Sequence, residues 1–451
     1  MNIVIVGAGN TGRYLATVLS ENQHNVLVID KDKKKLEQLS QTLDIATRIG
    51  SGDDWQLLDS VLELFPDLFI AMTKNDDTNM VACSLAKQLG YPSTIARVHD
   101  NRYLNRTRLD FGRIFDVDHF VCPELLAASE MMKYIVSEGA LVVNYFLHGA
   151  VQLRTIKVPD DWVKANEPLH QLNMPEGLMI GLIYREDPIT KKSQVIFPHG
   201  SDHILPGDEV TFVGDTEAIN ELATVLSLPK QTIHSIILVG GTPTAFHLAK
   251  MLEKGEYNVR IYEKDSERAV YLSEHLSRTT IINHDALDID FLRSEKVINT
   301  DLIISCTNHD ATNLLSVLTG REAGCPNALM LLLNQSTAPL LKKLNINHVV
   351  SPIILSASRI LSRVFPGGVS TLVSLYDNRA EVIEVTVSIN SKIVGIPLSD
   401  LGPLLPKNFL IAIIQNRGRI IIPNGQRILS PGDKAILITS PEHVAEVEQV
   451  F

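Results

Sequence analysis

The first thirty residues constrain the fold more than any other stretch. The apolar run 3–6 leads directly into Gly7-Ala8-Gly9-Asn10-Thr11-Gly12, a G-x-G-x-x-G pattern. An amphipathic segment follows, and a second apolar run, 26–29, ends in Asp30. Strand, glycine turn, helix, strand and acid, in this order, form the dinucleotide-binding fingerprint. The sequence therefore predicts a Rossmann-type nucleotide-binding unit at the start of the chain.

Each part of this pattern has a physical role. Gly7 allows the tight turn, Gly9 lets a pyrophosphate approach the backbone, and Gly12 lets the helix pack closely on the strand. Asp30 can accept hydrogen bonds from a ribose diol, and its charge disfavours a 2′-phosphate, which indicates NAD(H) or an adenosine ribose over NADP. The alternative, a glycine-rich turn in another α/β protein, is disfavoured because strand, helix and acid are all present.

The next hundred residues continue the alternation of strands and helices. Strands are expected at 46–49, 68–72, 94–98 and 119–122, with helices to about 43, over 55–64, to 89 and from 125. Asp53 and Asp54 can cap the helix at 55–64, and Asp53 also follows a strand at the adenine end of such a site. Thr73, which comes after the strand 68–72, is either a ligand contact or a helix cap. Ligands bind at the carboxyl ends of the strands in these sheets.

Arg97 lies inside an apolar strand with no acidic neighbour visible on its own face. A cation in that position needs an anion or an exit to solvent. We favour contact with a ligand phosphate over solvation at a sheet edge.

Composition excludes several other classes of protein. The chain has 451 residues, enough for about three or four domains, and a net charge of −11, which argues against general attraction to nucleic acid. Its four cysteines form no C-x-x-C pair, so neither a disulfide framework nor a metal site is expected. No signal peptide fits, and no apolar run approaches the ~20 residues of a membrane span.

A second, smaller kind of segment begins near residue 139. Short strands are expected at 141–146, 151–158, 178–184, 194–197 and 209–213, with a helix over 216–226. His199 and His203 could suggest a metal pair, but no third ligand lies at a useful spacing, so we interpret them as part of a polar loop.

The chain then repeats itself. Residues 236–245 restate the opening run, Glu263 takes the place of Asp30, and 304–313 restate 70–79. The small segment also recurs, because 397–401 match 168–172 and 430–433 match 205–208. Several matches at nearly one spacing indicate duplication. We therefore expect an α/β protein with tandem duplicated Rossmann-like, doubly wound parallel sheets, each followed by a small α+β C-lobe. The boundaries are 1–138, 139–228, 229–368 and 369–451.

The two copies differ at the glycine turn. The second keeps Gly240 but has Thr242 and Ala245 where the first has Gly9 and Gly12, and Pro243 removes a backbone donor. The arginine of the fifth strand is replaced within the apolar run 328–333. We expect the second copy to bind nucleotide more weakly or not at all, although Glu263 and Thr307 remain.

These features together resemble the TrkA family, the cytoplasmic regulatory subunits of bacterial Trk potassium-uptake systems. The resemblance covers the whole chain as two N-lobes and two C-lobes of the kind that regulates potassium conductance (RCK domains). It is carried by the segments 3–12, 28–32, 67–73 with Asn79, 95–98 and 123–125.

The resemblance implies binding of NAD(H), with ATP or ADP as alternative ligands at the same sites. The residues it implies are Gly7, Ala8, Gly9, Asn10, Thr11, Gly12, Asp30, Asp53, Thr73, Lys74 and Arg97 in the first copy, and Gly240, Gly241, Thr242, Glu263 and Thr307 in the second. It also implies a homotetrameric ring, held on the cytoplasmic face of the membrane by a potassium-translocating partner and not itself inserted in the bilayer.

The function that we expect is therefore ligand gating, in which nucleotide favours one arrangement of the ring. An NAD-dependent oxidoreductase is the chief alternative, but the small lobes show no catalytic His, Lys or Tyr set, so no enzyme activity is expected. A nucleotide sensor for another channel or antiporter is a further alternative.

Overall fold

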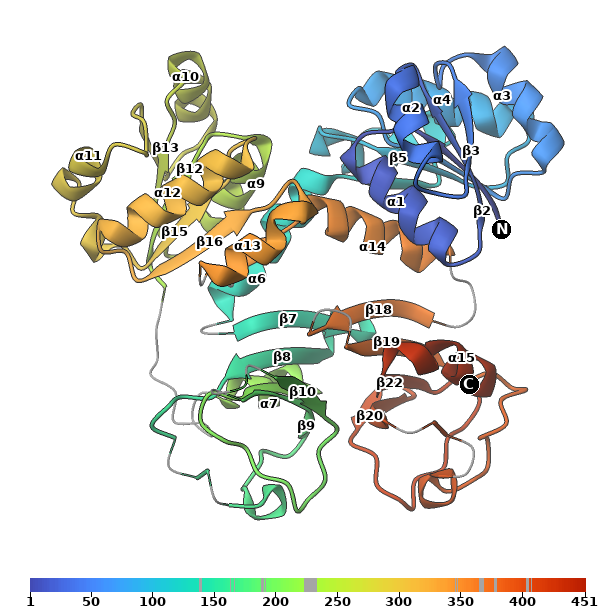
Figure 1. Ribbon diagram of the computed structural model, residues 1–451, viewed down its shortest axis with the longest axis vertical. Helices are drawn as coiled ribbons and strands as arrows, with labels where there is room; N and C mark the ends of the chain where they lie inside the picture. The colour runs from blue at the N-terminus through green and yellow to red at the C-terminus, as the bar shows by residue number, and fades with distance from the viewer. Residues whose placement is uncertain are drawn as a thin grey trace. The chain divides into compact units, whose positions relative to one another are not determined.

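Figure 1 shows the computed structural model of the protein. It describes residues 1–451 apart from 138–139, 163, 166, 188–189, 191, 223–232, 345, 347, 365–368, 377–378, 403–404 and 407. The chain forms two compact units, and each draws on both halves of the sequence. Unit 1 is Met1–Met132 with Ile233–Ile360, and unit 2 is Lys133–Thr232 with Leu361–Phe451.

Unit 1 begins with a six-stranded parallel sheet in the order β3-β2-β1-β4-β5-β6. Its strands are β1 (Asn2–Val6), β2 (Asn25–Asp30), β3 (Ala46–Ile49), β4 (Leu68–Ala71), β5 (Thr94–Arg97) and β6 (His119–Val121). The residues of β4 are all buried, as expected for a strand that is covered on both faces. The strand order reverses between β1 and β4, and such a reversal marks the ligand crevice of a doubly wound sheet.

Helices cover both faces of this sheet (Figure 1). They are α1 (Asn10–Glu21), α2 (Lys33–Ser40), α3 (Trp55–Val61), α4 (Asp76–Leu89), α5 (Phe111–Ile114) and α6 (Pro123–Val136), with 3-10 turns η1 (Leu62–Leu64) and η2 (Asn101–Leu104). Asp32, Asp54 and Asn75 cap α2, α3 and α4 by accepting backbone N–H groups.

The second N-lobe repeats this plan in the order β14-β13-β12-β15-β16-β17. Its strands are β12 (Ser235–Val239), β13 (Asn258–Tyr262), β14 (Thr280–Ile282), β15 (Leu302–Ser305), β16 (Asn327–Leu331) and β17 (Val349–Val350). Its helical elements are α9 (Pro243–Leu252), α10 (Ser266–His275), α11 (Ile289–Ser294), η5 (Val297–Asn299), α12 (Asp310–Glu322), η6 (Gln335–Thr337), α13 (Ala338–Lys343) and α14 (Pro352–Val364). The predicted tandem of Rossmann-like sheets is confirmed.

Unit 2 contains two antiparallel five-stranded sheets with the same strand order, β10-β9-β11-β8-β7 and β21-β20-β22-β19-β18. The first C-lobe consists of β7 (Ala140–Phe146), η3 (Leu147–Gly149), β8 (Val151–Lys157), η4 (Leu169–Gln171), β9 (Leu178–Glu186), β10 (Ser193–Ile196), β11 (Glu209–Asp215) and α7 (Thr216–Asn220). The second consists of β18 (Val369–Leu375), β19 (Ala380–Thr386), η7 (Leu398–Asp400), β20 (Phe409–Asn416), β21 (Arg419–Ile421), β22 (Lys434–Thr439), η9 (Pro441–His443) and α15 (Val444–Val450).

The two C-lobes share one apolar core, which explains why they form a single unit. Leu182 and Val213 from the first lobe belong to the same buried cluster as Ile413 and Ile438 from the second. The close approach depends on Gly181, because a Cβ atom there would lie 2.6 Å from Cδ1 of Ile438. The rings of Tyr184 and Tyr376 also stack, with centroids 4.8 Å apart, as offset aromatic pairs prefer.

Some predicted details need correction. The helix expected over 55–64 ends as α3 at Val61 and continues only as the 3-10 turn η1, and Asp54, not Asp53, is its cap. Asn75, not Thr73, caps α4. The helix expected over 216–226 is described only as α7, and residues 223–226 lie outside the described part of the chain. The exact domain boundaries stay a prediction.

All four cysteines are buried and free, in agreement with the expectation that they form no disulfide. Among the described residues, no helix combines the length and the apolar character that crossing a bilayer requires.

A buried asparagine ties together two strand ends in each N-lobe. Asn79 accepts hydrogen bonds from the backbone N and hydroxyl of Thr73, at 2.9 and 2.7 Å, and donates to the carbonyl oxygen of Arg97 at 2.9 Å. Asn313 makes the same bonds to Thr307 and to the carbonyl oxygen of Leu331. One amide side chain thus fixes the ends of the fourth and fifth strands in both copies.

We expect Asn79→Ala to lower the free energy of unfolding by about 2–4 kcal/mol, because it leaves buried backbone groups without partners. Chemical denaturation followed by circular dichroism measures this change. Asn299→Ala, which removes an exposed amide of unit 1, is the control and should change the stability little. Equal stability of the two variants would contradict the assigned role of Asn79.

Candidate nucleotide-binding site

The first glycine turn is fixed by backbone contacts on both sides. Gly7 has φ +108°, and a Cβ atom there would meet the carbonyl group of Met72 at 3.0 Å. A Cβ atom on Gly12 would lie 1.9 Å from the carbonyl oxygen of Gly7. Neither position has room for a side chain, so both glycines serve the turn and the packing of α1.

Gly9 differs from these two because it faces open space. It is the N-cap of α1 with an extended backbone, and a Cβ atom there would have no neighbour within 4 Å. Being glycine, it supplies no side chain to cap the helix, and the first turn of α1 contains no acidic residue. The N–H groups at the start of α1 and the positive end of its dipole can therefore serve an anion such as a phosphate.

Asp30 connects this turn to the end of β2. Its Oδ2 accepts the backbone N–H of Ala8 at 2.6 Å, and its Oδ1 accepts that of Asp32 at 2.8 Å. A carboxylate oxygen can accept more than one hydrogen bond, so both atoms keep the capacity to accept from a ribose diol. Asp30 thus orients the turn and can also contact a ligand.

The other predicted residues lie at the neighbouring strand ends but differ in their contacts. Thr73 is adjacent to Gly7, and its hydroxyl donates to Asn79 and accepts from the backbone N of Asn75. Lys74 is exposed. Asp53 hydrogen bonds with the hydroxyl of Ser51, which lowers the pKa of its carboxyl group. The structure therefore brings Thr73 to the glycine turn, while Asp53 belongs to the loop after β3.

For Arg97 the structure removes the less favoured alternative, a sheet edge, and corrects the expectation that this arginine has no acidic neighbour. Strand β5 lies between β4 and β6, so it is not an edge strand. The arginine also has an acidic partner, since its Nη2 lies 3.3 Å from Oε1 of Glu124 and 2.9 Å from Nε2 of His99. His99 in turn contacts Asp76, and although burial alone would raise the pKa of Asp76, hydrogen bonds from His99 and Asp100 hold it below its ordinary value.

The second glycine turn has the same backbone geometry as the first and the same contact with an acid. Gly240 has φ +90°, and a Cβ atom there would lie 2.8 Å from Cγ2 of Thr307. Glu263 accepts the N–H groups of Gly241 at 2.5 Å and Asp265 at 2.8 Å, as Asp30 does in the first lobe. The acid and the turn are therefore equivalent in the two copies.

The chain's own side chains, however, occupy the second turn. The hydroxyl of Thr242 donates to the carbonyl oxygen of Cys306 at 2.6 Å and accepts the backbone N–H of Ala245, so it caps α9. Arg268 donates from Nε to the carbonyl oxygen of Gly241 at 2.5 Å and lies over the ring of Tyr271. One N–H that a pyrophosphate could use, that of Ala245, therefore already has a partner, and the side chain of Arg268 lies against the turn.

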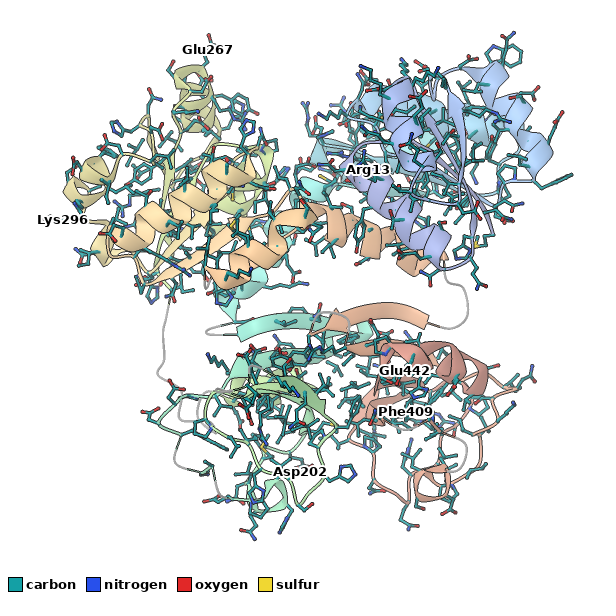
Figure 2. The ribbon with its side chains drawn as sticks, viewed as in Figure 1. Arg13, Asp202, Glu267, Lys296, Phe409 and Glu442 are labelled. Carbon is teal, nitrogen blue, oxygen red and sulfur yellow. The ribbon has the colours of Figure 1, made fainter. Side chains whose placement is uncertain are left out.

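Sequence reasoning missed Arg268 and the exposed Arg13. Arg268 is the third residue after the cap Asp265, a position from which a helical side chain can reach back to the strand end. Arg13 lies on α1, four residues after Gly9, and its Nη2 is 3.4 Å from Oε1 of Gln38; Figure 2 shows it labelled on that helix.

Asn10, at the start of α1 in the first N-lobe, also contacts the second N-lobe. Its side-chain amide donates to the carbonyl oxygen of Leu333, in the loop after β16, at 3.4 Å. The reverse contact joins Asn101 of the first lobe to His247 on α9, with 3.5 Å between Nδ2 and Nδ1. Each glycine-turn helix thus lies against the other N-lobe.

Comparison with known proteins places these features in a family. The TrkA-N domain matches residues 3–123 and 236–352, and the TrkA-C domain matches 153–227 and 382–451. A Methanosarcina mazei protein described as "Trk system potassium uptake protein TrkA homolog 1" is 30% identical over 459 residues, which cover all of both chains. The Haemophilus influenzae "Trk system potassium uptake protein TrkA" is 29% identical, with 100% of this chain and 98% of its own covered.

A solved structure described as "GsuK channel bound to NAD" has a similar fold. It aligns with a TM-score of 0.62 and 17% identity over 100% of this chain and 78% of its own. The duplicated sheets, the glycine turns and the full-length matches agree. The chain belongs to the TrkA family.

Proposed function

We propose that the chain is a nucleotide-sensing regulatory subunit. It binds NAD(H), ATP or ADP at the first glycine turn and gates a membrane-embedded Trk-type potassium-uptake protein from the cytoplasmic side. The observation that carries this proposal is the open, uncapped N-terminus of α1 at Gly9 beside Asp30. Membership of the TrkA family and the names of its relatives support the potassium-uptake role.

The first lobe offers a separate group for each part of a nucleotide. The N-terminus of α1 receives phosphate, Asp30 accepts from the ribose hydroxyls, and Arg97 at the end of β5 supplies positive charge. In the second lobe the hydroxyl of Thr242 accepts the N–H of Ala245 and so caps α9, and Arg268 donates to the carbonyl oxygen of Gly241. We therefore assign the tighter site to the first lobe.

Binding acts by shifting a population of conformations. A ligand that prefers one arrangement of a homotetrameric ring changes the equilibrium by its differential affinity, typically ~1–3 kcal/mol for each coupled site. Several sites together can then change the state of the membrane partner. A nucleotide sensor that serves a different channel or antiporter would use the same machinery.

An NAD-dependent oxidoreductase remains the chemical alternative, because its cofactor would use the same turn. Steady oxidation of NADH by the purified protein with a candidate substrate would favour that alternative. Our proposal expects NADH to bind without being oxidised. The absorbance of the reduced nicotinamide, followed over time with the protein and a candidate substrate present, distinguishes the two possibilities.

We expect Asp30→Ala to weaken NADH binding by about tenfold or more, because a charged acceptor for the ribose diol is lost. Isothermal titration calorimetry measures the change. Asp44→Ala removes an exposed carboxylate of the same lobe and should leave the affinity within about twofold. Unchanged affinity of Asp30→Ala would count against the site.

Gly9→Val tests the assignment of the first lobe. Because nothing lies within 4 Å of the added Cβ and the backbone is extended, the variant should fold normally. The added side chain should fill the space that a pyrophosphate needs and abolish the tightest binding event in calorimetry. If that event survives in Gly9→Val and is lost in Glu263→Ala, the second-lobe counterpart of Asp30→Ala, the tight site belongs to the second lobe.

The partner can be identified directly. A tagged chain should co-purify with a Trk-type membrane protein, and potassium flux through that protein in vesicles should change with nucleotide only when the chain is present. Recovery of a different channel or antiporter would support the alternative sensor role.

A further inference from the structure

Arg97 already has an anionic partner. Its guanidinium lies against Glu124, and the two side chains are only 17% and 16% exposed. Nε2 of His99 is 2.9 Å from the same Nη2 atom and 3.7 Å from Oε1 of Glu124. The Nε atom of Arg97 is buried and has no hydrogen-bond partner among the described residues. The arginine is thus held by a carboxylate yet still has a donor to offer.

Glu124 belongs to a helix that leads away from the first lobe. It lies in the first turn of α6, where the helix dipole favours a negative charge. Further along α6, the Sδ atom of Met131 is 3.8 Å from Sγ of Cys306 in the second lobe. The carbonyl oxygen of Cys306 accepts the hydroxyl of Thr242, the N-cap of α9. One helix therefore joins the partner of Arg97 to the second glycine turn.

The negative charge of Glu124 also acts on His247, a residue of α9. Burial lowers the pKa of His247, while Glu124 and Asp100 act in the opposite direction. His247 is 7% exposed and contacts Asn101. A change in the position of Glu124 would therefore change the electrostatic environment of His247 on α9.

A ligand phosphate at Arg97 would create a conflict of charges. The phosphate and the Glu124 carboxylate are both anions, and the largely buried setting weakens the solvent screening between them. Arg97 has donors for both, but its single positive charge cannot balance two anions, so each anion weakens the hold of the other. One of the two anions must move away from Arg97. Glu124 can do so because it stays in the first turn of α6, where the helix dipole continues to stabilise its charge.

We propose that Glu124 is an internal competitor for Arg97, which a ligand phosphate displaces, and that this displacement transmits occupancy of the first glycine turn along α6 to the second N-lobe. The inference rests on the proposed nucleotide site of the first lobe. It assigns Glu124 as a coupling residue, not as a ligand contact.

The first test compares ligands with and without phosphate. In calorimetry, Glu124→Gln should bind ADP about fivefold or more tightly than the wild-type chain, because the competing charge is gone. Binding of adenosine, which has no phosphate, should be unchanged. Glu63→Gln removes an exposed carboxylate from the same lobe and controls for net charge. Thermal denaturation and a second variant, Glu124→Ala, separate the effect on binding from a defect in folding.

The outcomes separate the inference from the function on which it rests. Weaker or equal ADP binding by both Glu124 variants, with the wild type binding normally, overturns the competitor role. Weaker binding shows that Glu124 orients Arg97 for the phosphate, and equal binding shows that Glu124 does not affect it. If the wild-type chain binds none of NADH, ATP and ADP, the proposed function itself fails.

The second test follows transmission by hydrogen exchange of the backbone amides at 243–248. In the wild type, ADP should change their exchange, and ligand-free Glu124→Gln should already show the ADP-bound level. If ADP produces the same change in the wild type and in Glu124→Gln, the second turn responds to ADP directly and transmission through Glu124 is excluded.

Discussion

The N-lobes depend on the hydrogen bond that a strand-end carboxylate accepts from the backbone of the glycine turn. Asp30 holds the N–H of Ala8, and Glu263 holds that of Gly241. In both lobes the same acid also accepts an N–H two residues further along the chain. These charge-assisted bonds join the first two strands at the crevice. The acid therefore stabilises the fold whether or not a ligand is bound. This structural role explains why the second copy keeps an acid, Glu263, although its glycine turn differs.

The two copies differ in the residue that caps the helix after the glycine turn, but they share the turn and its contact with an acid. The N-cap of α1 is Gly9, which leaves the helix N-terminus open, whereas the N-cap of α9 is Thr242, which satisfies it internally. A single side chain decides whether the positive end of a helix is available to an anion. Arg268 adds a second internal contact to the same turn. The second lobe keeps the glycine turn and its acid, while Thr242 and Arg268 make contacts to carbonyl oxygens that the described residues of the first lobe lack.

The sequence was sufficient to predict what depends on local pattern. The glycine turns, the acids, the doubly wound parallel sheets and the duplication all follow from short motifs and their repetition. The partner of Arg97 could not be predicted in this way, because Glu124 approaches it only through the parallel pairing of β5 with β6, in which Arg97 lies opposite Val121. The contact of Met131 with Cys306 is likewise set by tertiary packing across two lobes. Local motifs thus identify a site, while contacts between distant segments determine how it is coupled.

If a ligand phosphate binds at Arg97 as proposed, the internal counter-ion Glu124 has a physical consequence for sensing. It lowers the affinity for ligand, because part of the binding energy is spent on displacing Glu124 from Arg97. The same competition gives the ligand a differential effect on two states of the chain, and only such an effect can shift a conformational equilibrium. A lobe with Arg97 free would bind nucleotide more tightly but would have no contact to release. Moderate affinity and a transmitted signal are then two results of one ion pair.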